Sequence, residues 1–478
     1  MAESDIERLR DAIDHAWEEA LKFGLDPFPT HFELVPASIM YEFASYSIPG
    51  RFSHWTHGKA YHRQKMQYDF GLSKIYEMVI NTNPSYAFLM DMNDLLQNTF
   101  VAAHVFGHTD FFKNNAYFQH TSRRMIDKVS IHAERIAKYE FDHGKAEVEH
   151  FLDAVLSIQE HVDYNLLIRE EKPRDPNAKD EKTPGMYDDL WGMDERMRKA
   201  EEERERRTNK PAKFPEKPQK DILLFLSQHA PHLAPWQRDI IEIVRTEMLY
   251  FVPQMQTKVI NEGWASLWHS RIMRRLGDTG VISDSETIEF AQLHSGVLSP
   301  SRTSLNPYYL GFKMLEAIEH RWDNPTPEER DRLGRKPGMG MQKLFEVREM
   351  ENDVSFLRNY LTEDLVKELD LYLYKKEGDD WVIAEKNWEK VRDGIVASMN
   401  NFGAPYLVVD NGDYRGNREL YIVHVFEGQE LDMNYAEKTL QHVHLLWGRP
   451  VHLETIYDGK KILISYDGER STKSTLDK

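Results

Sequence analysis

The chain has 478 residues, a formal net charge of −18 and 41% hydrophobic residues, enough for a packed core in roughly two to four domains. The acidic balance argues against binding to nucleic acid or to anionic lipid, because both need a positively charged surface. There is no cysteine, so any metal must be held by His, Asp or Glu. Without a signal-like apolar core or an apolar run of ~18 residues, the sequence predicts a cytoplasmic protein with no membrane span.

The first part of the chain is predicted to be mainly helical. Apolar residues recur at helical spacing between Ile6 and Leu21, which predicts an N-terminal amphipathic helix. The segment 27–62 is rich in aromatic residues, Pro and Ser, and is expected to form loops with short helices. Further helices are expected at residues 68–80, 91–112, 122–139 and 145–164.

A change in composition marks residues 169–221. This segment is charged, dotted with Pro and poor in apolar residues, so it is predicted to be a solvated insertion or linker. After it, residues 236–276 are strongly apolar at helical spacing and predict a deeply buried helix that Pro253 should kink. Helical patterns then continue to about residue 374.

The C-terminal part alternates between strand-like and helical patterns in the order β-α-β-β-α-β-β. Its last two strands are expected to form a hairpin around Asp458 and Gly459, a strong hairpin signal. The predicted fold class is therefore α+β, with a large, mainly helical N-terminal domain followed by a small α+β C-terminal domain. The predicted divisions are 1–168 and 222–376 for the two parts of the helical domain, 169–221 for the insertion and 377–478 for the small domain.

The stretch 101-VAAHVFGHTDFF-112 places His104 and His108 four residues apart on an apolar segment. On a helix these two imidazoles share one face and could hold one metal ion, as in H-E-x-x-H zinc sites. About one such pair is expected by chance in this sequence, so the context decides. Gly107 within a predicted helix indicates that something packs close to the backbone. The alternatives are a metal site and two core histidines hydrogen-bonded to their neighbours.

A third ligand is expected from the stretch 260-INEGWASLWH-269. Glu262 lies in so apolar a helix that its carboxylate needs a cation, a metal or a proton beside it. The Glu-Gly-Trp tripeptide is similar to the third-ligand helix of some helical zinc peptidases. The sequence thus favours His104, His108 and Glu262 as ligands of zinc or another divalent metal, with His269 behind the ligands rather than among them.

Catalysis is less clearly indicated, because Val105 stands where a zinc peptidase carries its general-base Glu. This argues against the standard peptidase mechanism and leaves metal-dependent hydrolysis with a carboxylate placed elsewhere, for which Asp110 and Glu149 are the candidates. Whether the protein is an enzyme is left open by these residues. The polar and aromatic run that contains His54 and Lys59 could line a pocket, and it could equally form an ordered surface loop.

Four stretches in this order carry a resemblance to a known family: 45-SYSIPGRFSHWTHGK-59, 103-AHVFGHTDFFKNN-115, 260-INEGWASLWHSRIM-273 and 306-NPYYLGFKMLEAIEHRWD-323. Together they resemble the stage V sporulation protein R (SpoVR) family over nearly the whole chain. The resemblance implies a bacterial cytoplasmic protein that takes part in sporulation and in building the spore cortex. It also implies two partners, a PrkA-type serine protein kinase and a von Willebrand-like companion protein.

Two interpretations of function follow from the residues and the resemblance. The first is a zincin-like metal-binding protein, or a metal-dependent hydrolase. The alternative is a non-enzymatic adaptor that acts with the kinase and its companion through an acidic surface and the C-terminal domain.

Overall fold

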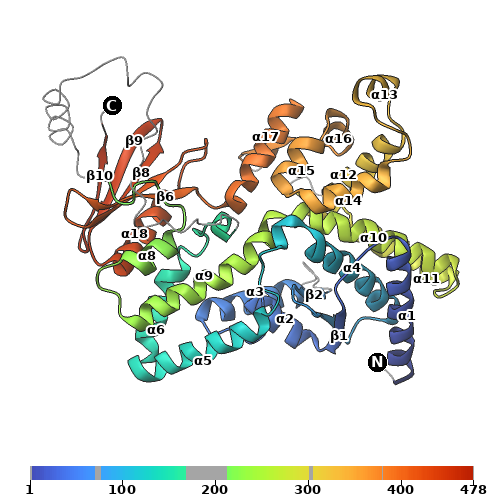
Figure 1. Ribbon diagram of the computed structural model, residues 1–478, viewed down its shortest axis with the longest axis horizontal. Coiled ribbons are helices and arrows are strands. Elements are labelled where there is room, and N and C mark those ends of the chain that lie inside the picture. Colours follow the sequence, from blue (N-terminus) through green and yellow to red (C-terminus); the bar gives the residue numbers. More distant parts are fainter. Residues whose placement is uncertain (1–2, 70–76, 168–212, 301–304, 379, 477–478) are drawn as a thin grey trace, which may run out of the picture. The chain divides into compact units, whose positions relative to one another are not determined.

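A computed structural model describes residues 3–69, 77–167, 213–300, 305–378 and 380–476 of the chain. Contacts between residues divide it into two compact units. The first unit comprises residues 1–149 and 249–404, and the second comprises residues 150–248 and 405–478. The expected fold class is confirmed: helices dominate the N-terminal part, and small sheets lie mostly toward the C-terminus (Figure 1).

Helix α10 (Lys258–Asp278) is the central helix of the first unit. It packs against α4 (Leu95–Asn114) on one side and α12 (Pro307–Asp323) on another (Figure 1). Most of its residues are buried, including the large side chains of Trp264 and Trp268. Because a helix that is apolar on nearly all sides must be surrounded by other elements, α10 forms the middle of the core.

Two glycine contacts bring these helices unusually close together. A Cβ atom added to Gly107 on α4 would lie 2.6 Å from the Cα atom of Ala265 on α10. A Cβ atom added to Gly263 would lie 2.3 Å from the carbonyl carbon of Gly311 on α12. Both distances are too short for any side chain, so glycine is required at these crossings. The close approach expected at Gly107 is present.

Two further helices pack against this centre. Helix α1 packs against α4 and α10, and α14 packs against α12. The expected kinked helix over residues 236–276 is instead two helices, α9 and α10, which are separated at Thr257 close to Pro253. The other bounds are α1 Glu3–Lys22, α2 Ala37–Tyr46, α3 Trp55–Asp69, α5 Met125–His143, α6 Lys145–Leu156, α9 Pro235–Gln256, α11 Asp284–Val297, α13 Pro327–Leu333, α14 Gly340–Met350, α15 Asp353–Tyr360, α16 Glu363–Glu368 and α17 Trp388–Met399.

A three-stranded sheet beside α4 was not expected from the sequence. Its strands are β1 (Thr30–Val35), β2 (Glu77–Ile80) and β3 (Ser85–Met90), in the order β1-β3-β2, with β1 parallel and β2 antiparallel to β3. The helix expected over residues 68–80 is therefore wrong at its C-terminal end, which is strand β2. Short apolar runs do not distinguish helix from strand by periodicity, and the pairing with β3 decides the outcome.

The second unit is built on a five-stranded sheet in the order β10-β9-β8-β7-β6, with helix α18 against β8 and β9. Asp458 and Gly459 both have positive φ, 49° and 68°, at the turn between β8 and β9, so the expected hairpin is confirmed. Asn411 and Gly412 lie inside β6, at a register shift. The bounds are α8 Ile222–His229, β6 Leu407–Tyr414, β7 Glu419–His424, α18 Met433–Trp447, β8 Val451–Tyr457, β9 Lys460–Tyr466 and β10 Ser471–Thr475.

The two units do not follow the divisions predicted from composition. Strands β4 (Leu373–Glu377) and β5 (Asp380–Glu385) form a separate hairpin, which belongs with α17 to the first unit. The second unit also contains residues 150–248 from earlier in the chain, where Phe225 on α8 stacks on Trp447 of α18. Of the predicted insertion, residues 213–221 belong to this unit, where Gln219 bridges to β6, and the preceding residues lie outside the described part of the chain. None of the described helices is both long enough and apolar enough to span a bilayer.

Candidate metal centre

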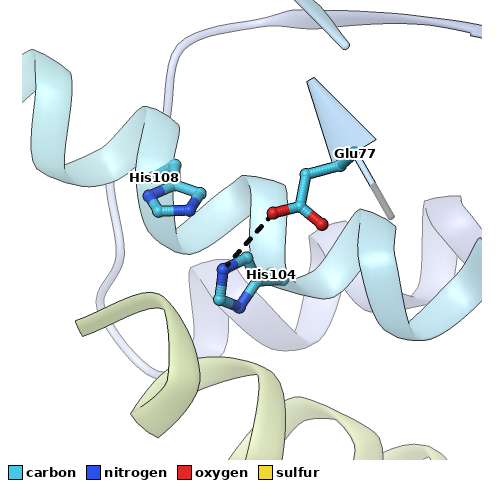
Figure 2. A group of neighbouring side chains, drawn as sticks. All are labelled: Glu77, His104 and His108. Carbon is cyan, nitrogen blue, oxygen red and sulfur yellow. Dashed lines mark ion pairs between the residues drawn. The ribbon is translucent and has the colours of Figure 1, made fainter. Parts of the chain in front are cut away.

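Three side chains from α4 and β2 meet at one point inside the first unit. The ligand atoms of Glu77, His104 and His108 all lie within 4.8 Å of one another, so this group could hold a metal ion. Figure 2 shows Glu77 reaching from β2 toward His104, with His108 one turn further along α4. His104 Nε2 lies 3.8 Å from Glu77 Oε1. Both histidines are buried, with exposed fractions of 3% and 4%.

A fourth side chain, Glu262 of α10, approaches the same point. Its Oε2 atom lies 3.5 Å from His104 Nε2 and 3.4 Å from His108 Nε2. Four ligands placed tetrahedrally about 2.0–2.1 Å from a zinc ion are themselves about 3.3–3.4 Å apart. The separations between Glu262 and the two histidines therefore match the edges of such a tetrahedron. Helix α10 can bring Glu262 this close because Gly107 lets it pack directly on α4.

The Nε2 atoms of His104 and His108 face Glu262, and a contact at Nδ1 on the opposite side of each ring holds that ring in place. His108 Nδ1 lies 2.9 Å from Asn261 Oδ1, which can only accept, so Nδ1 carries a hydrogen and Nε2 faces Glu262. His104 Nδ1 lies 2.8 Å from His269 Nδ1. A contact of this kind behind a histidine is the usual way in which proteins orient a metal ligand.

The electrostatics of the group call for a positive charge. Burial lowers the pKa of His108, but the neighbouring Glu262 outweighs burial, and the pKa lies above its ordinary value. Burial raises the pKa of Glu262, but His104 and His108 outweigh it and hold the pKa well below its ordinary value. Two buried atoms, His104 Nε2 and Glu262 Oε2, have no hydrogen-bond partner among the described residues. A cation between them would satisfy both atoms.

Tyr308, near the start of α12, completes the surroundings of Glu262. Its ring stacks on His104 with the centroids 6.0 Å apart. Burial, together with the negative charges of Glu262 and Glu77, holds the pKa of Tyr308 well above its ordinary value. The hydroxyl therefore keeps its hydrogen and is a donor toward the carboxylates.

The two residues considered as general bases lie elsewhere. Asp110 is fully buried, and its carboxylate accepts hydrogen bonds from Arg348 at 2.8 and 2.9 Å and from Trp264 Nε1 at 2.9 Å. It also accepts from the backbone N–H of Asp26 at 2.7 Å, so it ties α4 to α10 and α14. Glu149 lies half-exposed on α6, outside the group of donors around His104.

Of the three residues predicted to lie behind the ligands or to line a pocket, one contacts His104 and two lie outside the group. His269 lies directly against His104, with the two Nδ1 atoms 2.8 Å apart. His54 is buried just before α3, with Nδ1 2.7 Å from the hydroxyl of Thr56, and Lys59 is exposed on α3. Neither His54 nor Lys59 belongs to the group that contains His104 and His108.

Glu77, His294 and Tyr308 were missed by reasoning from the sequence. Glu77 lies on a strand that was not predicted, so nothing local connected it with His104. His294 of α11 lies 2.8 Å from His269 Nε2 through its Nδ1 atom. Tyr308 belongs to a stretch that supported the family resemblance, which was the one signal that could have pointed to it.

These observations define a mainly helical protein with a buried His/Glu group that could hold a metal ion. The chain belongs to the SpoVR family: the model described as "SpoVR like protein" matches residues 3–404, and the "SpoVR-like C-terminal domain" matches residues 405–458. The border between the two matches coincides with a border between the two structural units. The resemblance noted from the sequence is thus confirmed.

One relative was found among curated proteins. The chain is 30% identical over 460 residues to "Uncharacterized protein YcgB" of Escherichia coli (strain K12), which covers 90% of this chain and 88% of that protein. No solved structure matches the chain.

Proposed function

We propose that this SpoVR-family protein binds one divalent metal ion through His104, His108 and Glu262. The observation that carries the proposal is the convergence of two Nε2 atoms on one carboxylate oxygen, at 3.4 and 3.5 Å. Two imidazoles with one or two carboxylates suit zinc and also suit iron(II). Such an ion would supply Lewis acidity and would lower the pKa of a water molecule beside it.

Glu77 is the best candidate for the general base that α4 lacks. Val105, which follows His104, is fully buried in the hydrophobic core, so a carboxylate at that position could not face the histidines. Glu77 approaches from the sheet instead, with Oε1 3.8 Å from His104 Nε2. It would accept the proton of an attacking water molecule, and the Tyr308 hydroxyl would donate a hydrogen bond to the oxygen that becomes negatively charged.

The reaction class that fits these groups is hydrolysis of an amide or a related acyl bond. The family name connects the chain with sporulation, and the process we propose is formation of the spore cortex. Peptidoglycan amides in the cytoplasmic stage of its synthesis are accordingly the first substrates to test.

The test is elemental analysis of protein purified without an affinity-metal step and without chelator. We expect close to one equivalent of metal in the wild type and its loss in Glu262→Gln, which keeps the size of the side chain but removes its charge. Glu77→Gln should retain the metal, since Glu77 is assigned as the base. Glu149→Gln is the matched control, because its carboxylate lies outside the group of donors.

The outcomes separate the assignments. Substoichiometric metal in the wild type would contradict the proposal. Loss of metal in Glu77→Gln would make Glu77 a ligand and would leave the base unassigned. Metal in the wild type and in Glu262→Gln alike would remove Glu262 from the ligands and would leave Glu77, His104 and His108 to hold the ion.

A non-enzymatic adaptor is the second candidate, favoured by the net charge of −18 and by a separate C-terminal family match over residues 405–458. In this role the chain would act with a PrkA-type serine protein kinase and a von Willebrand-like companion protein. The adaptor interpretation predicts that Glu262→Gln still co-purifies with both partners and still supports sporulation. Loss of sporulation with retained co-purification would favour the metal-dependent hydrolase.

A further inference from the structure

Three histidines form a line that leads away from the candidate metal centre. His104 Nδ1 lies 2.8 Å from His269 Nδ1, and His269 Nε2 lies 2.8 Å from His294 Nδ1. The three rings come from α4, α10 and α11 (Asp284–Val297). His104 and His269 are buried, whereas His294 on α11 is half-exposed.

Counting hydrogens leaves two arrangements for this line. Each neutral imidazole carries one ring hydrogen, and each of the two N···N contacts needs one hydrogen between its nitrogens. The third hydrogen must therefore sit at one end of the line, on His104 Nε2 or on His294 Nε2. With the hydrogen at His104, every ring donates away from α11; with the hydrogen at His294, every ring donates toward it.

The surroundings of His104 Nε2 favour a different arrangement with and without a metal. Without a metal, a hydrogen on this atom can point at Glu262 Oε2, 3.5 Å away, whereas a lone pair there would face a carboxylate. With a metal, Nε2 must offer its lone pair, so the hydrogen of His104 must be on Nδ1.

We infer that metal binding reverses the direction of the hydrogen bonds along His104, His269 and His294; this inference rests on the proposed metal site. The hydrogen on His104 Nε2 leaves to solvent, and His104 Nδ1 takes the hydrogen of His269 Nδ1. His269 Nε2 then takes the hydrogen of His294 Nδ1, and His294 Nε2 takes one from water. Three N–H bonds break and three form, so each ring keeps one hydrogen.

This arrangement makes His269 and His294 positioning residues for the metal. His269 offers the acceptor that His104 Nδ1 needs in the metal-bound state, and His294 offers the acceptor that His269 Nε2 needs in turn. Metal binding at the buried His104 thereby changes which nitrogen carries the hydrogen on His294, a half-exposed ring on α11 that contacts no proposed metal ligand.

The test is long-range ¹H–¹⁵N correlation NMR of the full chain labelled with ¹⁵N-histidine, without metal and with one equivalent of zinc. His294 should carry its hydrogen on Nδ1 without zinc and on Nε2 with zinc, and its signals are assigned from a His294→Gln sample. In His269→Phe, which interrupts the line, His294 should no longer respond, and zinc affinity should fall by about 10–100-fold. Circular dichroism of this variant checks that it is folded.

Calorimetric titration of the same sample separates the two proposals. Zinc that binds in one equivalent while His294 keeps its hydrogen on the same nitrogen would overturn this inference alone. If no zinc binds, the proposed function fails, and the inference fails with it. A response of His294 that persists in His269→Phe would also overturn it, because the signal would then not travel through the line.

Discussion

Replacing Gly107 by alanine should disrupt the candidate metal centre without touching any of its ligands. The added Cβ atom would lie 2.6 Å from Ala265 Cα and 3.1 Å from Ala265 Cβ. Ordinary contact begins at 3.4 Å, so α4 and α10 would have to separate by about 0.8 Å at this point. A backbone atom cannot move aside as a flexible side chain can, so the helices themselves must shift.

The same shift determines the effect on the metal. Glu262 is carried by α10 and the two histidines by α4, so their separations of 3.4 and 3.5 Å would lengthen by a similar amount. Functional groups must be held within about 0.5 Å of their working geometry, and a shift of this size exceeds that. We expect metal affinity to fall by about tenfold or more. Overpacking costs about 1–3 kcal/mol, partly offset by the better helix propensity of alanine, ~1 kcal/mol.

The assay is competitive titration with a chelating metal indicator, together with thermal unfolding of the metal-free protein. Gly58→Ala is the matched control, since Gly58 lies in helix α3 and an added Cβ atom would meet nothing within 4 Å. It should leave both the metal affinity and the unfolding midpoint unchanged or slightly raised. Wild-type affinity and an unchanged midpoint in Gly107→Ala would refute the argument, because the helices would then not be in the contact described.

Three further predictions concern other parts of the chain. Asp110→Asn should destabilise the first unit by about 3–5 kcal/mol, because it leaves the buried Arg348 without its ion-pair partner at 2.8 Å. The metal content of this variant should stay unchanged. Loss of metal in a folded Asp110→Asn variant would contradict the structural role of Asp110. Burial lowers the pKa of His161 to about 4, so the contribution of this residue to stability is present above pH 6.5 and is lost as the pH falls toward 4. His161→Gln should therefore remove about 3 kcal/mol of the loss of stability between pH 7 and pH 4, measured by denaturant unfolding. An unchanged dependence of stability on acid pH in this variant would count against the prediction. Deleting residues 405–478 removes Trp447 from its stack on α8, so residues 213–248 should become sensitive to limited proteolysis, and continued resistance would show that this segment folds alone.

Local patterns account for the parts of the candidate site that could be predicted from the sequence. His104 and His108 share one helix face, so their spacing was sufficient to pair them. Glu262 was recognisable because a carboxylate in an apolar helix needs a partner. Glu77 could not be found in this way, because its position depends on β2 pairing with β3 and on β3 pairing with β1, none of which has a local signature. His294 was missed for the same reason, since only the packing of α11 brings it to His269.

The fold shows the same limit. The hairpin at Asp458 and Gly459 was predictable because two adjacent residues with positive φ specify it locally. The division into units was not, because the stack of Phe225 on Trp447 joins segments more than 200 residues apart in a chain whose composition changes between them. The amino-acid composition of a segment indicates whether that segment is exposed to solvent, but it does not indicate which distant segment it packs against.

The glycine contacts explain why the centre could form with no carboxylate after the first histidine. With Gly107 against Ala265, α10 comes close enough for Glu262 to reach both imidazoles, while the α4 side chains on the other faces, Val105 among them, are enclosed by the core. A carboxylate at position 105 would be enclosed by this core, so a carboxylate near the histidines has to come from another element. Strand β2 brings Glu77 to 3.8 Å from His104. A motif search that requires Glu directly after the first histidine would therefore overlook this candidate centre.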